Sequence, residues 1–474
     1  MGRYRKLIRA SAFGTAVLRE IHWKTLLGGS IMKVDRRHAF RRITMGMVTV
    51  LALALFMGTQ ATSAQAPSPI NANDVSILFP LPNSSDMSGF ISLADLTDSN
   101  GQRLLSDQAF GKFISAAESD DSKIVDSLGG ANQIAFPPEI KDVNTWFVAG
   151  IRLDLGAPGL APDVMAKFGQ IPQLRLILQP VTRTSGTAVR VHDRAAHIIF
   201  SFASGPSAQQ ETCPVRVVPR IDADMTAFRP LLDDFVSLRD DLTAGKLGSP
   251  VETGGPLNVH PGLSGPDQQH MRDRLEVILE KHLKASQVTA LAVMGIPKAS
   301  PEPWIFLAMR RNPASDTVQT VPSPAFDGQA KAQLLKFVGP EQVLPEPKSD
   351  NQSEITTCFR MPNTRVGVST AELLRQESSK ERNIEVTEII ADPARSHFFN
   401  TDCVSCHTET RLLLKKVPDT VIPGVDVSVL PRSRWNVRNF GWGFEGGTFK
   451  PTITRRTATE TDEVVKAANQ LLIP

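Results

Sequence analysis

The stretch WFVAGIRLDL, residues 146–155, decides the fold class because apolar and charged side chains alternate along it. Its residues Ile151, Leu153 and Leu155 are separated from one another by single charged residues. This period of two is typical of a β-strand that turns one face towards a core. The stretch therefore predicts a strand in a sheet with one apolar face.

Three further stretches in this part of the chain have strand character. QLRLILQPV at 173–181 places leucines at alternate positions, and AVRVHDRAAHIIFSF at 188–202 has the same character. VSILFPLPN at 75–83 is short and contains proline, which is typical of an edge strand. Because the connections are rich in Gly, Pro and Ser, we expect a β-rich, mostly antiparallel part over residues 67–222.

The hydrophobic period changes in the middle of the chain. Apolar residues between 228 and 242 repeat at spacings of three and four, which predicts an amphipathic helix, and a second helix is expected over 266–284. Two apolar strands are expected at 288–296 and 304–311. Residues 223–390 are therefore predicted to form a mixed α and β region that packs against the first sheet.

The last part of the chain, residues 391–474, is expected to be small and mostly helical. TETDEVVKAANQLL at 459–472 places its apolar residues on one helical face, behind Thr459 and Thr461 as candidate caps. The three parts together predict an α+β fold with a β-rich N-terminal part, a mixed middle and a helical C-terminal segment.

The N-terminal residues 1–66 have the layout of a secretory signal peptide. Four arginines lie between positions 36 and 42, an apolar run covers residues 43–57, and cleavage is expected near Ala64 or Ala66. An apolar run of about 15 residues is short for a membrane span, which usually needs roughly 20. We therefore expect export to the bacterial periplasm, the envelope or the medium, without a permanent membrane span after cleavage.

Charge and start position add to this expectation. Residues 1–66 hold 11 of the 52 Lys and Arg and 2 of the 49 Asp and Glu, which leaves 41 basic against 47 acidic residues in the remainder. A weakly acidic mature chain argues against a nucleic-acid partner.

Met32 is an alternative start, because a leader that begins there has the ordinary length of a signal peptide. The sequence contains none of the common hydrolase or nucleotide-binding motifs.

Cysteine and histidine chemistry is concentrated in NTDCVSCHTET, residues 400–410. Cys403, Cys406 and His407 form the pattern C-x-x-C-H, in which two thiols add to the vinyl groups of a haem and the adjacent imidazole becomes an axial ligand of the iron. The two-residue gap between the cysteines spans the two vinyl groups. Because this attachment takes place after export, the predicted signal peptide is independent support.

Three other interpretations of the motif stay open. Cys403 and Cys406 could form half of a tetrahedral zinc site, although the sequence offers no second pair of ligands with suitable spacing. They could also form a redox-active disulfide, which would be expected at a helix start after a strand, or a purely structural disulfide. We expect one covalent haem c as the cofactor.

Residues 396–416 resemble the haem-binding segment of c-type cytochromes. The resemblance covers the five-residue motif and its helical continuation TETRLLLKK. It implies that Cys403 and Cys406 carry the thioether bonds and that His407 is the proximal ligand of the haem iron. Outside this segment, the chain resembles no family that we recognise.

The chain departs from small c-type cytochromes in its second axial ligand. Those proteins carry the motif near the N-terminus and a methionine ligand some tens of residues later, whereas no Met or His follows His407 in this chain. A second ligand would therefore come from upstream, and His397 and Met361 are the candidates. If neither reaches the iron, that position would be open to a small ligand.

An aromatic stretch lies between the motif and the last predicted helix. RWNVRNFGWGFEGGTF at 434–449 could exclude water from a haem, and Arg434 and Arg438 could pair with its propionates. The alternative is an aromatic-rich turn that closes the core. The spacing of these residues does not decide between the two.

The mature chain contains four cysteines, because all of them lie downstream of the predicted signal peptide. Besides the two in the motif, Cys213 and Cys358 are expected either to form a disulfide or to be buried thiols. An oxidising compartment favours the disulfide, but the sequence leaves both alternatives open.

These observations predict an exported monohaem protein, similar to c-type cytochromes, that exchanges single electrons with a redox partner protein. A haem enzyme with an open iron position, peroxidase-like or a dehydrogenase subunit, is the first alternative. An envelope binding or scaffold protein with a structural haem is the second. No catalytic residue is predicted.

Overall fold

The computed structural model describes much of the chain after residue 68, and residues Ser68–Pro474 form one compact unit. The described residues are 69–84, 86–125, 130–155, 172–184, 186–202, 225–297, 304–321, 332–338, 342–345, 380–396, 401 and 403–472. The predicted signal peptide, Cys213, Cys358, Met361 and His397 lie outside them. The described part confirms an α+β, β-rich fold.

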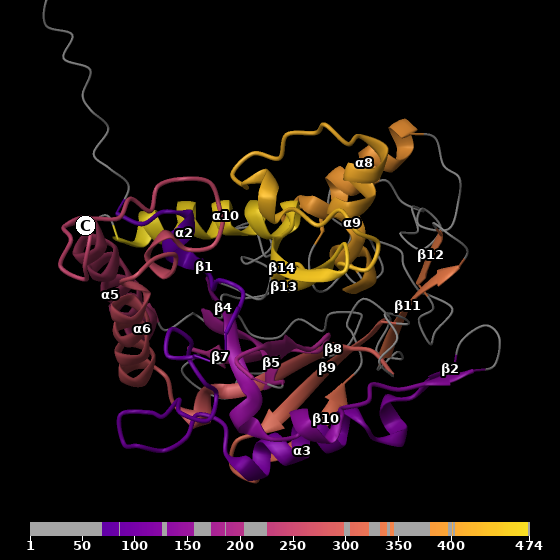
Figure 1. The fold of residues 1–474 in the computed structure, drawn as a ribbon, viewed down its shortest axis with the longest axis horizontal. Helices are drawn as coiled ribbons and strands as arrows, with labels where there is room; N and C mark the ends of the chain where they lie inside the picture. The colour runs from indigo at the N-terminus through magenta and orange to yellow at the C-terminus, as the bar shows by residue number, and fades with distance from the viewer. Residues whose placement is uncertain are drawn as a thin grey trace, which may run out of the picture. The chain divides into compact units, whose positions relative to one another are not determined.

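A ten-stranded sheet forms the centre of this unit (Figure 1). Its strands are Ser76–Leu78 (β1), Trp146–Asp154 (β4), Gln173–Arg183 (β5), Val189–Val191 (β6), Ala195–Ser201 (β7), Val288–Gly295 (β8), Trp304–Asn312 (β9), Thr317–Val321 (β10), Ala332–Val338 (β11) and Gln342–Pro345 (β12). They lie in the order β1-β4-β5-β7-β8-β9-β11-β12, with β6 paired to β5 and β10 to β9. All of these described pairings are antiparallel.

The predicted strands form the middle of this sheet. The three stretches between residues 146 and 202 contain β4, β5 and β7, and the two predicted strands after residue 287 are β8 and β9. The short proline-containing stretch contains β1, which is an edge strand. β7 pairs with β8 so that His197 lies opposite Ala292, and strands from before and after residue 222 therefore lie side by side in one sheet.

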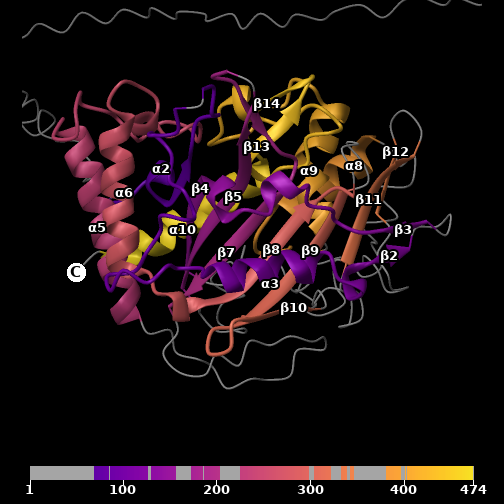
Figure 2. The same cartoon turned by 60° about the horizontal axis from the view of Figure 1, so that its bottom comes forward.

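One face of the sheet carries the main apolar core, and we call it the apolar face. Helix α3 (Asp107–Ala117) lies across it, over β7 to β9 (Figure 2). The rings of Phe110 and Phe113 pack edge-on against Trp146, with centroids 5.9 and 6.3 Å apart. Ile198 of β7 is buried on the same face, where it lines a small cavity together with Ala196, Phe110 and Phe113.

The opposite face is covered by the C-terminal elements, and we call it the polar face. These elements are α8 (Lys380–Ala391), α9 (Cys403–Lys416), the hairpin β13 (Phe440–Glu445) and β14 (Thr448–Ile453), and α10 (Arg455–Leu472). Figure 1 shows them above the sheet and α3 below it. Gln179 of β5 donates to the Trp442 carbonyl (2.8 Å) and Arg152 of β4 pairs with Glu460 (2.9 Å), which places β13 and α10 on this face.

The remaining described elements lie around this layered centre. They are α2 (Ala72–Val75), α5 (Met225–Thr243), α6 (Gln268–His282), the strand pair β2 (Ile124–Val125) and β3 (Ala131–Asn132), and the short 3-10 turns Asp120–Ser122, Pro138–Ile140, Val143–Thr145, Pro261–Leu263, Ala285–Gln287 and Val427–Val429. α5 and α6 are the two helices predicted for the middle region. None of the described helices combines the length and the apolar composition that crossing a membrane requires.

The start of the last helix differs from the prediction. α10 begins at Arg455, so Thr459 and Thr461 lie inside the helix and the prediction that they cap it is wrong. Thr461 donates its hydroxyl to the Thr457 carbonyl (2.7 Å), as a threonine inside a helix does. Thr454 takes the capping position instead, because its Oγ1 accepts a hydrogen bond from the Thr457 N–H (3.3 Å).

Candidate functional site

The C-x-x-C-H motif forms the first turns of α9, which begins at Cys403. Cys406 and His407 follow at spacings of three and four, so the three side chains lie on one face of the helix. All three keep part of their surface accessible, whereas Val404 and Ser405 between them are buried. The helix therefore presents both thiols and the imidazole together.

Strand β11 fixes the start of α9. The side chain of Gln333 accepts a hydrogen bond from the Cys403 backbone N–H at its Oε1 (2.8 Å) and donates its Nε2 to Cys403 Sγ (3.4 Å). The first N–H groups of a helix have no partner within the helix, and this buried glutamine supplies one. The first cysteine of the motif is thus tied to the sheet.

The His407 ring is held in one orientation. Its Nδ1 lies 2.7 Å from the Val437 carbonyl oxygen, and its centroid lies 4.9 Å from that of the Phe306 ring. A carbonyl only accepts, so Nδ1 carries the proton and donates it, which leaves Nε2 as the basic nitrogen. Among the described residues, none forms a hydrogen bond with Nε2. Burial lowers the pKa of His407 to about 4, so the ring is neutral at pH 7 and able to bind a metal.

The motif helix rests on an apolar cluster of the sheet. The cluster consists of Ala195, Met294, Ile296, Trp304, Phe306 and Leu335 from the sheet and its margins, with Val404 of α9 and Val437, and with Cys403, Leu412 and Trp435 packed at its border. Side chains of this kind exclude water from the surface beside the motif. A dry, apolar surrounding is one of the means by which a protein sets the reduction potential of a metal group.

Two buried arginines near the motif have donors that find no acceptor among the described residues. Arg438, 2% exposed, donates its Nε to the Trp442 carbonyl (3.3 Å) and has Nη2 3.6 Å from Asp193, but its Nη1 forms no hydrogen bond. Arg152, 5% exposed, uses Nη1 for Glu460, while its Nε and Nη2 form none. Buried guanidinium donors without partners are costly, so both side chains are suited to bind carboxylates of a ligand.

A patch of accessible side chains lies in the middle of the polar face, and we call it the sheet floor. It consists of His197 and Ile199 on β7, Ala290 and Ala292 on β8, and Ala308 and Arg310 on β9. Strand pairing places His197, Ala292 and Ala308 in one row, two residues along the strand from the row of Phe306. These residues keep part of their surface accessible, although they lie on central strands of the sheet.

His197 of the sheet floor lies near His407. Burial is the largest cause that lowers the pKa of His197 well below its usual value, and the charges of Arg175 and His407 add to it. The two imidazoles therefore lie within range of each other's charge, although 210 positions separate them in the sequence. Both face the space between the polar face and α9.

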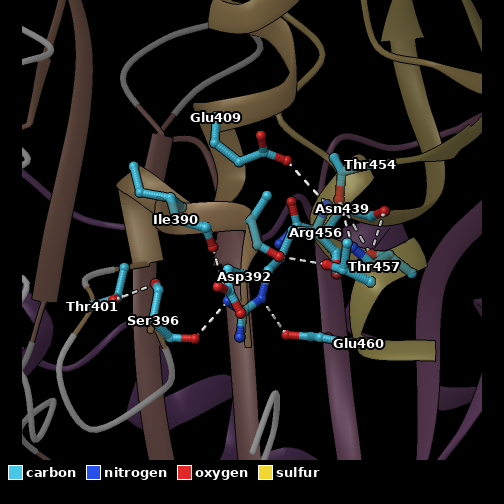
Figure 3. A network of polar contacts seen from close by, with 12 residues as sticks. Ile390, Asp392, Ser396, Thr401, Glu409, Asn439, Thr454, Arg456, Thr457 and Glu460 are labelled. Carbon is cyan, nitrogen blue, oxygen red and sulfur yellow. Dashed lines mark hydrogen bonds and ion pairs between the residues drawn. The ribbon is translucent and has the colours of Figure 1, made fainter. Parts of the chain in front are cut away.

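A buried polar network behind the motif joins the C-terminal helices to each other and to the sheet (Figure 3). Arg456 Nη1 donates to the carbonyls of Ile390 (2.8 Å) and Ser396 (2.6 Å), and its Nε donates to Glu460 (2.6 Å). Glu460 pairs in turn with Arg152 of β4. Burial acts to raise the pKa of Glu460, but the charges of Arg456 and Arg152 outweigh it and lower the pKa to about 2. The ionised carboxylate therefore links α10 to the sheet through its two ion pairs.

The motif helix also caps the last helix. Glu409 Oε1 accepts a hydrogen bond from the Arg456 N–H (3.0 Å; Figure 3), and Thr410 Oγ1 accepts one from the Arg455 N–H (2.8 Å). These two N–H groups belong to the first turn of α10, where acceptors are needed. Because Glu409 and Thr410 directly follow the motif, α9 and α10 are fixed to each other close to His407.

The aromatic stretch 434–449 is divided between the site and the core. Trp435 and Cys403 both pack against the apolar cluster of the sheet, and the Arg434 guanidinium lies 4.2 Å from the Trp435 ring centroid. Trp442 is fully buried elsewhere and packs edge-on against Phe90, with centroids 5.9 Å apart. Most of the stretch forms the β13–β14 hairpin, a strand pair that the sequence analysis did not predict.

Comparisons of the chain with protein-family models, with curated proteins and with solved structures found no match. Among the described residues, no three His, Cys, Asp or Glu side chains are grouped as the ligands of a metal ion would be. A haem c requires a different set: two thiols and an imidazole on one helix face, an apolar surface, and cations for its carboxylates. The described residues supply each of these, so the site fits a haem.

Proposed function

We propose that this protein is exported, binds one haem c through Cys403, Cys406 and His407, and transfers single electrons between redox partner proteins. The observation that supports the proposal most is the geometry of His407. Its Nδ1 is bound to the Val437 carbonyl, which leaves Nε2 on the same helix face as the two thiols. The residues of the motif are thus in the orientation that haem attachment needs.

The attachment chemistry needs no oxidant. Each thiol adds across one vinyl double bond: a carbon–sulfur bond forms at one vinyl carbon, and the thiol hydrogen goes to the other. When bound, the haem supplies a single reversible electron change between the ferric and ferrous states of iron. The electron comes from a reduced partner protein and passes to an oxidised one, so the proposal includes partners on both sides of the exchange.

The chain's own side chains perform three tasks at this site. Gln333 and Glu409 hold the motif helix against the sheet and α10, so that the iron ligand keeps its place. Phe306 and the apolar cluster around it exclude water. Arg438 offers a buried positive charge for a propionate, which a planar guanidinium can bind through two hydrogen bonds.

The proposal can be tested by expressing the full chain, with its leader, in a bacterium that has haem-attachment machinery. Covalent haem is expected to survive a denaturing gel and to stain there, because thioether bonds resist denaturation. Substituting Cys403→Ser together with Cys406→Ser is expected to abolish the stain. The matched control, Cys213→Ser together with Cys358→Ser, removes the same number of thiols outside the motif and is expected to keep it.

A potentiometric titration of the purified protein tests the electron-transfer part of the proposal. We expect one reversible transition that fits a single electron, followed by the change in the visible spectrum of the haem. A parent chain without covalent haem would overturn the whole proposal. Covalent haem without a reversible transition would keep the attachment and overturn the carrier role.

A further inference from the structure

His197 differs from the other histidines that the structure describes. Each of the others forms a hydrogen bond through a ring nitrogen; they are His192, His260, His270, His282 and His407. No described residue forms a hydrogen bond with the His197 ring, although it lies on the central strand β7. The ring keeps part of its surface accessible, so its nitrogens are available to a ligand.

Small side chains lie beside His197 on one side of its strand. Its neighbours across the strand pairing are Ala292 on β8 and, one strand further, Ala308 on β9. All three residues are half-buried, although residues of β8 and β9 on the apolar face, such as Leu291 and Leu307, are buried. The row of His197 therefore has small side chains towards β8 and β9, whereas the larger Ile177 lies opposite it on β5.

The imidazole of His197 is turned towards the motif rather than away from it. Strand alternation places His197 on the same face as Phe306, which packs on the His407 ring, and as Gln333, which caps the motif helix. His407 is also among the charges that lower the pKa of His197, after burial and the charge of Arg175. The fold thus brings a second imidazole to the motif from a strand two hundred residues upstream.

The charged groups around His197 are mainly cations. Arg152 and Arg175 follow in the next row of the polar face, and Arg438 lies beside His407. Asp154 pairs with Arg175, Glu460 occupies one nitrogen of Arg152, and Asp193 lies 3.6 Å from Arg438 Nη2. Other donors of Arg152 and Arg438 form no hydrogen bond with a described residue. A positively charged wall beside two imidazoles suits a haem, whose two propionates are negatively charged.

We propose that His197 is the second axial ligand of the iron and that it takes the place for which His397 and Met361 were the sequence candidates. The inference rests on the proposed haem attachment and deepens it, because two imidazoles would close the iron to other small ligands. Ligation is the donation of a lone pair from a neutral ring nitrogen, so no proton or electron is exchanged. A closed iron favours an electron carrier over an enzyme with an open site.

The visible and electron paramagnetic resonance spectra of the ferric protein test this ligand. The parent is expected to be six-coordinate and low-spin, without the long-wavelength band that methionine ligation gives. His197→Ala is expected to become high-spin and to bind carbon monoxide when reduced, and added imidazole is expected to restore the low-spin spectrum. His197→Met, which keeps a ligand, is expected to stay low-spin and to gain the methionine band. Imidazole rescue and the methionine variant separate ligation from a loss of folding.

Matched controls identify the alternative ligands. His192→Ala removes an imidazole that is already bonded to Thr182 Oγ1 (2.7 Å), so its spectrum is expected to match the parent. His397→Ala and Met361→Leu are expected to have no effect either. Covalent haem that is high-spin in the parent, or that stays low-spin in His197→Ala, would overturn the ligand assignment alone. A parent without covalent haem would overturn both proposals.

Discussion

The two faces of the central sheet are built from the same strands and differ in what they carry. On β7, Ala196 and Ile198 are buried under α3 on the apolar face, whereas His197 and Ile199 are accessible on the polar face. The apolar face holds the aromatic cluster around Trp146, and large apolar side chains fill it. The polar face holds arginines, alanines and a histidine without a hydrogen-bond partner among the described residues.

This difference separates stability from chemistry within one sheet. Burial of large apolar side chains on the apolar face stabilises the fold. The polar face instead contains buried cations, which cost free energy unless something compensates for them. We infer that a bound group compensates for this cost. Substitutions on the apolar face are therefore expected to lower stability and to leave haem binding intact. Substitutions on the sheet floor are expected to impair haem binding and to change stability little.

The largest effect is expected from Trp146→Ala on the apolar face. The substitution removes a fully buried indole together with its hydrogen bond to the Ile140 carbonyl (2.8 Å), which is expected to lower the free energy of unfolding by about 3–5 kcal/mol. The protein that still folds should carry one haem with the spectrum of the parent. Chemical denaturation and the ratio of haem to protein measure the two effects. The exposed Val421→Ala is the control for stability, and haem loss in the folded fraction of Trp146→Ala would break the separation of the faces.

An effect on the order of 3 kcal/mol is expected from the pH dependence of Glu460. Its pKa of about 2, against a usual value of 4.5, means that the ionised form stabilises the fold fully above pH 4.5. This contribution to the free energy of unfolding is lost as the pH falls from 4.5 towards 2. Glu460→Gln lacks it, so denaturant unfolding should show a gap between parent and variant that is largest near pH 7 and narrows below pH 4.5. A difference in the free energy of unfolding that is constant with pH would contradict the assigned role of Glu460 in linking α10 to the sheet.

The smallest effect is expected from an alanine-to-valine substitution made once on each face of the sheet. The two variants compare the packing of the two faces directly. In the Cys403→Ser, Cys406→Ser background, Ala332→Val on the apolar face is expected to cost about 1–3 kcal/mol by overpacking, because Ala332 is buried opposite Leu307. Ala292→Val on the sheet floor is expected to cost less than about 0.5 kcal/mol, because Ala292 keeps part of its surface accessible. With the cysteines restored, Ala292→Val should reduce the yield of haem-loaded protein. Equal costs for the two valines would show that the floor is packed rather than open.

The sequence predicts the individual elements of this site better than it predicts which of them lie close together in the fold. Alternation in residues 146–155 predicts β4, and the motif spacing predicts that Cys403, Cys406 and His407 act together, because both signals are local. The approach of His197 depends on strand register and on which face α9 covers. A polar ring in an apolar strand is the one sign of it in the sequence.

Contacts that hold the motif are hidden for the same reason. Gln333 caps α9 from β11, and Glu409 caps α10 from α9, so each cap lies in a different element from the helix that it serves. Thr454, in contrast, caps α10 through the nearby Thr457 N–H, which is a local signal. The prediction missed it because it began the helix at residue 459, four residues after the observed start at Arg455. The β13–β14 hairpin contains a Gly-Gly turn at 446–447, a local signal that could have predicted it.

Mass spectrometry of a tryptic digest tests the central claim most directly. Cleavage after Arg395 and Arg411 gives the peptide SHFFNTDCVSCHTETR, residues 396–411, which contains both cysteines of the motif. From protein matured in a host with haem-attachment machinery, this peptide is expected to carry the mass of one haem on its two cysteines. Recovery of the peptide with two unmodified thiols, or with a disulfide between them, would contradict the account.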